Sequence, residues 1–296
     1  MMEHQPIKKL IVLAGPTAVG KTSFAIQVAK YFNTEIISSD SRQIYKELNI
    51  GVARPNENQL SEVKHHFIAT QSIFDPYDAG IYSQEVNQLL RKLFEIHDVV
   101  VMTGGTGLYI KAATEGLDIL PPKNEQLRQQ LNFILETEGL QALQAIVDSL
   151  DIDQSKTDLS NPQRIIRAIE IKQGVTEGQK PLDTSFFTPS YYFLNRGRQE
   201  LYTRINQRVD QMLKDGFEAE AKSLLPYRKL NALNTVGYKD FFSFFDGEIS
   251  KDIAIEKMKQ HTRNYAKRQL TWFRNQGSFR EISTDVELFL NIMKLG

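Results

Sequence analysis

The chain has 296 residues, of which 41% are hydrophobic and 24% are charged, so it can build a sizeable core as one large domain or as a domain with an insertion. Its formal net charge of zero neither favours nor excludes a polyanionic partner, and the absence of cysteine excludes disulfides, cysteine-based zinc sites and thiol nucleophiles. The apolar run at residues 10–14 is far too short for a membrane span or a signal-peptide core, so we expect a cytoplasmic protein with no membrane partner.

Three short apolar runs near the start of the chain predict buried parallel strands. They are residues 10–14, which end at a Gly-Pro pair, the segment TEIISSD, and the segment DVVVM, which runs into a glycine-rich turn. Between the first two, apolar residues recur at helical spacing: Ala25, Val28, Ala29 and Phe32. Strands that alternate with helices predict an α/β fold, with a P-loop NTPase-like parallel sheet flanked by helices.

The composition changes at Pro121-Pro122. The next stretch is rich in Gln, Leu and Glu with helical periodicity, and it ends in a loop-like segment that contains proline. The segment YYFLN, residues 191–195, again has the pattern of a strand, and the remainder is mostly helical. We therefore expect a mainly helical insertion domain at residues 123–190, within a P-loop core domain formed by residues 1–122 and 191–296.

A phosphate-binding motif lies between the first strand and the first helix. The segment GPTAVGKT matches G-x-x-x-x-G-K-[ST], a loop common in ATP-binding proteins. Its glycines let successive N–H groups point at one anion, beside the positive end of a helix. The lysine adds a mobile charge, and the threonine hydroxyl can bind Mg²⁺, the one cofactor that we expect. The predicted di- or triphosphate-binding residues are Gly15, Pro16, Thr17, Ala18, Val19, Gly20, Lys21 and the Mg²⁺ ligand Thr22.

The acidic residue that a nucleotide-hydrolysing enzyme needs is not where we expect it. P-loop NTPases usually hold Mg²⁺ with an acid at the end of an apolar strand. Here the segment DVVVM ends in Thr103-Gly104-Gly105-Thr106, and the only acid directly after a buried strand is Asp40. Asp40 could hold a metal through water or simply cap the next helix. The pattern therefore argues against a nucleotide-hydrolysing enzyme.

Several further segments, taken in order, resemble the tRNA dimethylallyltransferases, also called tRNA isopentenyltransferases, of the bacterial type. After GPTAVGKT they are DSRQIYKELNIGVARP, TGGTGLYIKA, NPQRIIRAIEI, RINQRVDQMLKDGFEAE, NTVGYKDF and YAKRQLTWFR, and together they span nearly the whole chain. The resemblance implies an enzyme that moves a dimethylallyl group from dimethylallyl diphosphate to N6 of the adenine 3′ to the anticodon, position 37 of tRNA, and releases diphosphate. The phosphate loop would then hold this diphosphate and not ATP.

The resemblance also implies catalytic roles for four residues. Asp40 matches the base that accepts a proton from the adenine N6 amine, and Thr106 matches a threonine near the bridging oxygen or the target nucleotide. Arg208 matches an arginine that reaches the diphosphate, although by itself it has the pattern of an exposed helix arginine. Lys21 stabilises the leaving group. The residues that follow Asp40 would touch the adenine or its neighbours; they are Ser41, Arg42 and Gln43.

Two basic clusters are candidates for contact with the RNA. Residues 251–280 contain eight Lys or Arg residues, among which Lys259, Arg263 and Lys267 are spaced four apart and would form one helical ridge facing phosphates. The alternative is an ordinary solvated helix face. The second cluster follows a predicted helix start at Asn161-Pro162, and the resemblance implies that it grips the anticodon stem-loop; its members are Gln163, Arg164 and Arg167. The alternative is a packing helix with exposed arginines.

Other functions remain open from the residues. A P-loop kinase of a small metabolite, a relative that prenylates free AMP, and an RNA-binding P-loop protein without catalysis share parts of the pattern. The helical insertion and the basic C-terminal region favour the tRNA enzyme, because a mononucleotide would need neither. His65-His66 lacks a carboxylate at ligand spacing and is not a predicted metal site. The expected partners are therefore tRNA and the prenyl donor, with no obligate protein partner evident.

Overall fold

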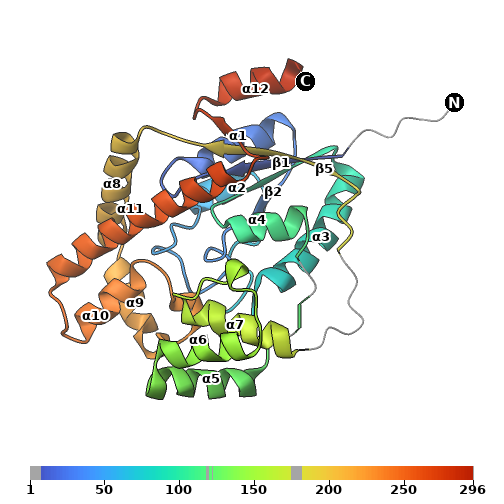
Figure 1. Ribbon diagram of the computed structural model, residues 1–296. Helices are drawn as coiled ribbons and strands as arrows, with labels where there is room; N and C mark the ends of the chain where they lie inside the picture. Colours follow the sequence, from blue (N-terminus) through green and yellow to red (C-terminus); the bar gives the residue numbers. More distant parts are fainter. Residues whose placement is uncertain (1–7, 118–119, 122, 175–181, 296) are drawn as a thin grey trace. The chain divides into compact units, whose positions relative to one another are not determined.

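The computed structural model describes residues 8–117, 120–121, 123–174 and 182–295 (Figure 1). The chain divides into two compact units, one formed by Met1–Gly116 with Leu182–Gly296 and the other by Leu117–Pro181. The predicted insertion, residues 123–190, therefore starts and ends later along the chain than the smaller unit does. Residues 182–190 group with the larger unit because Asp183 accepts hydrogen bonds from Asn87 and Arg91, and because Phe187 stacks on Phe94.

The larger unit contains a six-stranded sheet in which every pairing is parallel. The strand order is β3-β2-β4-β1-β5-β6. The strands are β1 Lys9–Ala14, β2 Ile36–Ser38, β3 His65–His66, β4 Val99–Gly104, β5 Thr188–Leu194 and β6 Arg280–Ile282. Because β2, β4 and β1 are neighbours and parallel, the loops that follow them meet at one edge of the sheet. The predicted strands correspond to β1, β2, β4 and β5, whereas β3 and β6 carry no clear pattern in the sequence.

Helices cover both faces of the sheet (Figure 1). Side chains of a strand alternate between the two faces, so Leu10 and Val12 of β1 pack with the helices α3 and α4, while Ile11 and Leu13 pack with α1, α8 and α12. The bounds of these helices are α1 Lys21–Tyr31, α3 Ala79–Ile96, α4 Gly107–Thr114, α8 Arg198–Lys214 and α12 Val286–Leu295. None of the helices in the described ranges is long and apolar enough to cross a membrane.

A second, mainly helical core lies beyond the strand edge of the larger unit. It joins Ile44 and Leu48, which follow the end of β2, to Phe217, Tyr238 and Met258. These aromatic and apolar side chains come from helices α9 Phe217–Leu224, α10 Tyr238–Phe245 and α11 Lys251–Asn275. The remaining elements of this unit are α2 Glu57–Glu62 and the short 3₁₀ turns Leu225–Tyr227 and Asn231–Leu233. This core fixes the segment after Asp40 and places one face of α11 beside the loops at the strand edge.

The smaller unit is helical in its described residues. It consists of α5 Glu125–Glu138, α6 Leu140–Ser149, a 3₁₀ turn at Gln154–Lys156 and α7 Pro162–Gln173. Its core is built from apolar side chains at helical spacing: Leu131, Leu143, Val147, Ile165, Ile166 and Ile169. Asn161 caps α7 by accepting hydrogen bonds from the N–H groups of Gln163 and Arg164, and Pro162 occupies the first turn, as the sequence predicts.

Candidate active site

The phosphate loop connects the carboxyl end of β1 to the start of α1. Gly15, Ala18 and Gly20 have φ angles of 150°, 63° and 108°, a backbone region that glycine occupies easily and alanine rarely. A Cβ atom on Gly15 would lie 2.9 Å from the carbonyl oxygen of Leu194 in β5, so a side chain at this position would force the loop away from the sheet. The loop therefore curls directly against the strand edge, beside the N–H groups at the start of α1.

Lys21, the first residue of α1, reaches back across the loop. Its Nζ donates hydrogen bonds to the carbonyl oxygens of Gly15 at 2.9 Å and Pro16 at 2.8 Å. Burial lowers the pKa of Lys21 to about 7; Asp40 opposes this shift, and Arg208 adds to it. Burial also lowers the pKa of Arg208 to about 10, and Asp40 again opposes the shift. Lys21, Asp40 and Arg208 line the same cavity, although they come from three different segments of the chain.

Asp40 follows β2, the strand next to β4. Its Oδ1 accepts hydrogen bonds from the backbone N–H groups of Arg42 at 2.9 Å and Gln43 at 3.3 Å. No helix begins there, so the cap considered from the sequence is in fact a tight turn. Within the described chain, Oδ2 of Asp40 has no hydrogen-bond partner. One oxygen of the carboxylate is thus occupied in fixing the turn, and the other is available for a ligand.

Thr106 ties the glycine turn after β4 to the turn at Asp40. Its Oγ1 accepts a hydrogen bond from the N–H of Ser41 at 3.1 Å and donates one to Oγ of Ser41 at 3.2 Å. A Cβ atom on Gly104 would lie only 2.2 Å from Oγ of Ser39, so the two turns are in close backbone contact. Thr106 is therefore held next to the turn that begins at Asp40.

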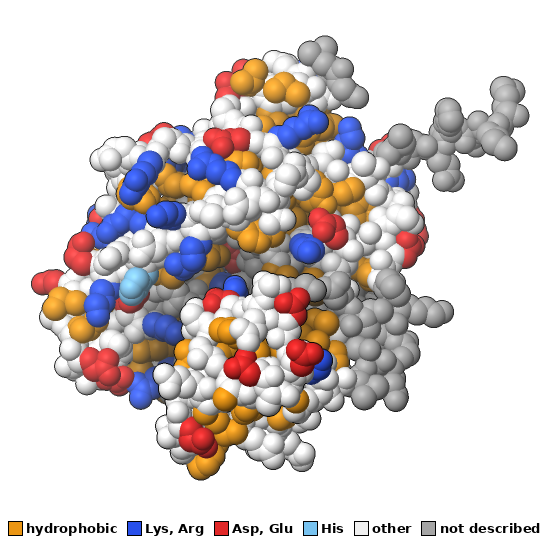
Figure 2. All heavy atoms as spheres, viewed as in Figure 1, with side chains coloured by type: hydrophobic (Ala, Val, Ile, Leu, Met, Phe, Trp, Pro, Cys, Tyr) orange, Lys and Arg blue, Asp and Glu red, His pale blue; other side chains and the backbone are white. Residues whose placement is uncertain are grey.

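A large cavity of about 890 Å³ opens at this edge of the larger unit. Most of the predicted phosphate-loop residues line this cavity, as do Asp40, Ser41, Thr106 and Arg208. Its lining includes six lysines or arginines and only two carboxylates, so it favours an anionic ligand. The cations are Lys21, Arg42, Arg204, Arg208, Lys239 and Arg268, and the carboxylates are Asp40 and Asp240. Figure 2 shows further Lys and Arg side chains on the face of this unit over α8 and α11.

Gln269 of α11 is a residue of the site that the sequence interpretation did not single out. Its side chain is 6% exposed, and both of its polar atoms are used. Oε1 accepts a hydrogen bond from the N–H of Thr17, and Nε2 donates one to the carbonyl oxygen of Gly105, both at 2.9 Å. Gln269 lies within the quoted segment YAKRQLTWFR, but an uncharged helix residue has no local pattern that indicates such a role.

The side chains of Arg42 and Gln43 already have partners in the protein. Arg42 donates to the carbonyl oxygens of Asn231, Ala232 and Asn234, and Gln43 donates to those of Val52 and Ala53. Both residues line the cavity. In this structure they therefore hold its walls together, and contact with an adenine, which the resemblance implies, would have to share or replace these hydrogen bonds.

The predicted ridge of Lys259, Arg263 and Lys267 is not a single free basic surface. Lys259 forms an ion pair of 2.8 Å with Asp210, and Arg263 donates to Oδ1 of Asn206 at 2.7 Å. Both partners lie on α8, which packs beside α11, and only Lys267 is fully exposed. The cavity-facing side of α11 is instead marked by His261, Tyr265, Arg268 and Gln269, among others.

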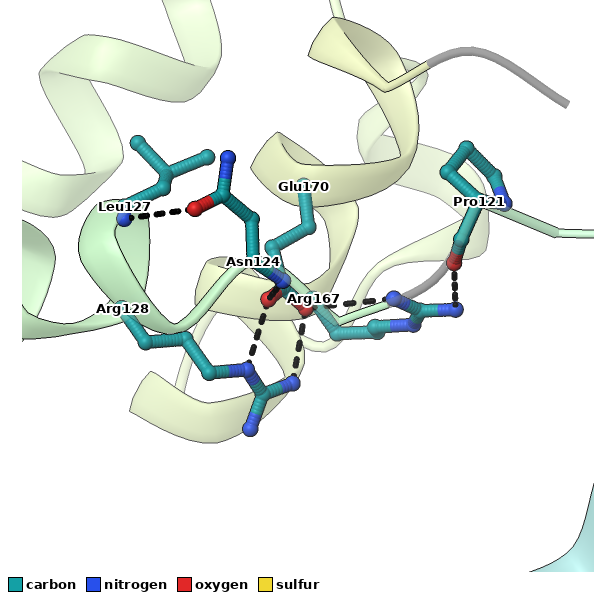
Figure 3. Close-up of polar contacts among 6 residues, drawn as sticks. All are labelled: Pro121, Asn124, Leu127, Arg128, Arg167 and Glu170. Carbon is teal, nitrogen blue, oxygen red and sulfur yellow. Dashed lines mark hydrogen bonds and ion pairs between the residues drawn. The ribbon is translucent and has the colours of Figure 1, made fainter.

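In the smaller unit, the three predicted RNA-binding residues differ from one another. Gln163 and Arg164 are exposed, and Arg164 has a long ion pair of 3.4 Å with Asp158. Arg167 instead donates to Glu170 at 3.2 Å and to the carbonyl oxygen of Pro121 at 2.8 Å (Figure 3). Arg167 is thus a structural residue, whereas the side chains of Gln163 and Arg164 are exposed to solvent.

Glu170 organises the polar centre of this unit, as Figure 3 shows. It is 2% exposed and accepts two hydrogen bonds from Arg128, at 2.6 and 2.7 Å, and one from the N–H of Asn124 at 2.9 Å. Burial alone would raise the pKa of Glu170, but these hydrogen bonds and the one from Arg167 lower it to about 2. Glu170 therefore carries its negative charge in the folded unit.

The residues at the phosphate loop fit a magnesium ion. Thr22 is half-buried at the start of α1 and lines the same cavity as Asp40. Within the described ranges, no three His, Asp or Glu side chains are grouped as a cage for a metal. Mg²⁺ commonly binds through one or two protein oxygens, water and the phosphates of its ligand, so the hydroxyl of Thr22 can be a sufficient protein contribution.

Comparison with known proteins identifies the family of this chain. The family model described as IPP transferase matches residues 43–276. The chain is 47% identical to a tRNA dimethylallyltransferase of Christiangramia forsetii, with 93% of each chain covered, and 45% identical to tRNA dimethylallyltransferase 1 of Bacteroides fragilis, with 92% of this chain and 93% of that protein covered.

Among solved structures, the full-length tRNA isopentenylpyrophosphate transferase of Bacillus halodurans superposes with a TM-score of 0.71 at 32% identity, covering 97% of this chain and 94% of that one. A eukaryotic dimethylallyltransferase acting on tRNA superposes with a TM-score of 0.73 at 25% identity, covering 94% of this chain and 74% of that one. The predicted P-loop NTPase-like fold and the predicted family are thereby confirmed. The chain belongs to the IPP transferase family.

Proposed function

We propose that this chain transfers a dimethylallyl group from dimethylallyl diphosphate to the N6 atom of an adenine in tRNA and releases diphosphate. The observation that carries the proposal is the convergence of a phosphate loop and a turn-fixed carboxylate, Asp40, in one cation-rich cavity. The names of the relatives, which act on tRNA, support this choice of substrate. Bond formation between N6 and C1 of the dimethylallyl group accompanies cleavage of the C1–O bond, whose electrons leave with the diphosphate.

The phosphate loop and its cations stabilise the leaving group. Negative charge grows on the bridging oxygen as the C1–O bond breaks, and the loop N–H groups, Lys21 and Arg208 lie where they can stabilise it. Mg²⁺ held by Thr22, with Asp40 nearby, would add further charge neutralisation when bound. The need to stabilise a departing diphosphate explains why a phosphate loop suits a reaction in which no phosphoryl group is transferred.

Asp40 is the base of the proposed mechanism. The N6 amine attacks with its lone pair and must lose a proton, which Oδ2 of Asp40 accepts while Oδ1 keeps the turn in place. Thr106, whose hydroxyl is fixed by Ser41, the residue after Asp40, aligns the amine with the allylic carbon. The adenine reaches this depth only if it leaves its stack and enters the cavity.

We further propose that the adenine is the one at position 37, next to the anticodon, and that the protein holds the anticodon stem-loop. Lys267 and Arg268 on the larger unit, and Gln163 and Arg164 on the smaller one, are exposed side chains that can donate hydrogen bonds to RNA phosphates. We place the reaction in the cytoplasm, where tRNA is available. Neither a kinase nor an enzyme that prenylates free AMP would need such exposed side chains for binding RNA.

Release of inorganic diphosphate tests the proposal. With dimethylallyl diphosphate, Mg²⁺ and an unmodified anticodon stem-loop, one equivalent of diphosphate should appear per RNA. A stem-loop with guanine in place of the target adenine should release none, because its nucleophilic N6 amine is missing. Turnover of ATP in place of the prenyl donor would support a kinase instead, and transfer to free AMP at an equal rate would support the mononucleotide enzyme.

A further inference from the structure

Two arginines hold the outer side of the phosphate loop. Arg196 donates from Nε to the carbonyl oxygen of Val19 at 2.9 Å, and Arg204 donates from Nε to that of Ala18 at 2.8 Å. A Cβ atom on Gly20 would lie 3.9 Å from an Nη atom of each. Both guanidinium groups therefore flank the same point of the loop, directly before Lys21. The contact with Ala18 also supports a residue whose φ of 63° is costly for a non-glycine side chain.

The two arginines differ in what their other nitrogens do. Arg196 forms an ion pair with Glu200, which neutralises its charge, and it is not part of the cavity wall. Arg204 lines the cavity, and none of the described acidic residues forms an ion pair with it. It lies one helical turn before Arg208 on α8, so the two side chains share a face of this helix. The Nη groups of Arg204 are thus free to bind a ligand of the cavity.

We propose that Arg204 is a second arginine that binds the diphosphate of the prenyl donor, together with Lys21 and Arg208. This inference rests on the proposed function. A guanidinium carries five N–H donors in a rigid fork, so Nε can keep its hydrogen bond to Ala18 while both Nη atoms bind phosphate oxygens. Arg204 then shapes the loop and neutralises the ligand at once, whereas Arg196 only shapes the loop.

The charge balance supports a second arginine. A diphosphate carries more than two negative charges at neutral pH, and the carboxylate of Asp40 lies in the same cavity. Several cationic donors are therefore needed around one anion, because unpaired charge is costly in a partly buried site. Arg204 is one of the cations that line this cavity, and its guanidinium stays protonated at any working pH.

Calorimetric titration of the full chain with inorganic diphosphate and Mg²⁺ tests this inference without RNA. Arg204→Gln should weaken binding about 10- to 100-fold, the loss expected for charge-assisted hydrogen bonds. Arg204→Lys, which keeps the charge, should recover a large part of the affinity. Arg196→Gln tests the loop contact alone and should weaken binding less than Arg204→Gln. Arg198→Gln removes the same charge from an exposed side chain that stacks on Tyr202 and should leave affinity unchanged.

The outcomes separate the possible roles. If Arg204→Lys and Arg204→Gln are equally weak and match Arg196→Gln, Arg204 only shapes the loop and the inference is wrong. If Arg204→Gln binds diphosphate like the unaltered chain but binds an anticodon stem-loop more weakly, the arginine serves the RNA and the inference is again wrong. If the unaltered chain does not bind diphosphate at all, the proposed function itself fails.

Discussion

Gln269 joins Thr17 of the phosphate loop to the glycine turn that carries Thr106, through two hydrogen bonds of 2.9 Å. The amide thereby sets the spacing between the part of the site that binds the leaving group and the part that positions the acceptor. A Cβ atom on Gly105 would lie 2.2 Å from Nε2 of Gln269, so any side chain at position 105 would displace this amide.

Replacing Gln269 by leucine should therefore impair both catalysis and stability. Two buried backbone groups lose their partner, which should cost about 2–3 kcal/mol of unfolding free energy. The loop and the turn should also lose their alignment, and the catalytic rate should fall about 100-fold. Thermal unfolding and single-turnover transfer measure the two effects separately. Gln260→Leu, an exposed change on the same helix, is the control; a Gln269→Leu enzyme with normal turnover would contradict the alignment role.

Asp40→Asn should separate the two functions of this side chain. Asparagine keeps an oxygen that can accept the hydrogen bonds from Arg42 and Gln43, so the turn should persist. It cannot accept the N6 proton, and the single-turnover rate should fall by about 100-fold or more. Affinity for the anticodon stem-loop, measured by fluorescence anisotropy, should remain nearly unchanged. A large loss of RNA affinity with normal turnover would show that Asp40 is a binding residue and not the base.

The lowered pKa of Lys21 predicts proton uptake on ligand binding. Burial sets this pKa at about 7, so Lys21 is mostly neutral above neutral pH in the free protein. A bound diphosphate favours the charged lysine, so binding above pH 7 should take up a proton and should weaken as the pH rises. Calorimetry at about pH 8.5 in two buffers of different ionisation enthalpy measures this uptake. Lys21→Met should take up close to one proton fewer; equal uptake by both proteins would argue against a neutral Lys21.

Glu170 should make the smaller unit sensitive to acid. Its pKa is lowered to about 2 from an ordinary 4.5, so the stability it contributes is complete above pH 4.5 and is lost as the pH falls toward 2. Glu170→Gln should remove about 3 kcal/mol at neutral pH, because Arg128 and Arg167 lose their partner. Hydrogen exchange of α5 and α7 should detect this loss, while Glu136→Gln, at an exposed position, should not change exchange. Unchanged protection in Glu170→Gln would show that the network is not stabilising.

The free and paired lysines of α11 should affect RNA binding differently. Lys267→Gln removes an exposed charge, so the slope of log affinity against log salt should become shallower by up to about 1. Lys259→Gln removes a charge that Asp210 already neutralises at 2.8 Å and should change the slope much less. Filter binding of an anticodon stem-loop at several salt concentrations compares the two. Equal effects would mean that Lys259 leaves Asp210 when RNA binds.

The parts of the site that could be predicted from the sequence are those built from local segments. The strand, loop and helix around Lys21 lie within about twenty-five residues, and their residue types require that geometry. Strand β3 is His-His and strand β6 is Arg-Glu-Ile, so neither shows the apolar run that marks the comparably short β2, and only their pairing with neighbouring strands defines them.

Contacts between distant segments could not be predicted. Gln269 meets Thr17 across 252 positions, and Arg204 meets Ala18 across 186, so only the packing of α8 and α11 against the loop brings them together. The same packing gives Lys259 a partner and removes it from the expected ridge. In the smaller unit, a buried carboxylate on its own helix engages Arg167, a consequence of tertiary burial that local spacing does not show.

Mass spectrometry of the RNA product tests the central claim most directly. An unmodified anticodon stem-loop is incubated with the protein, Mg²⁺ and either dimethylallyl diphosphate or ATP, and the product is digested and sequenced. The account predicts the addition of one dimethylallyl group, mapped to the adenine 3′ to the anticodon, with the prenyl donor only. No addition with dimethylallyl diphosphate, together with ATP turnover on a small molecule, would contradict the account and assign the phosphate loop to a kinase.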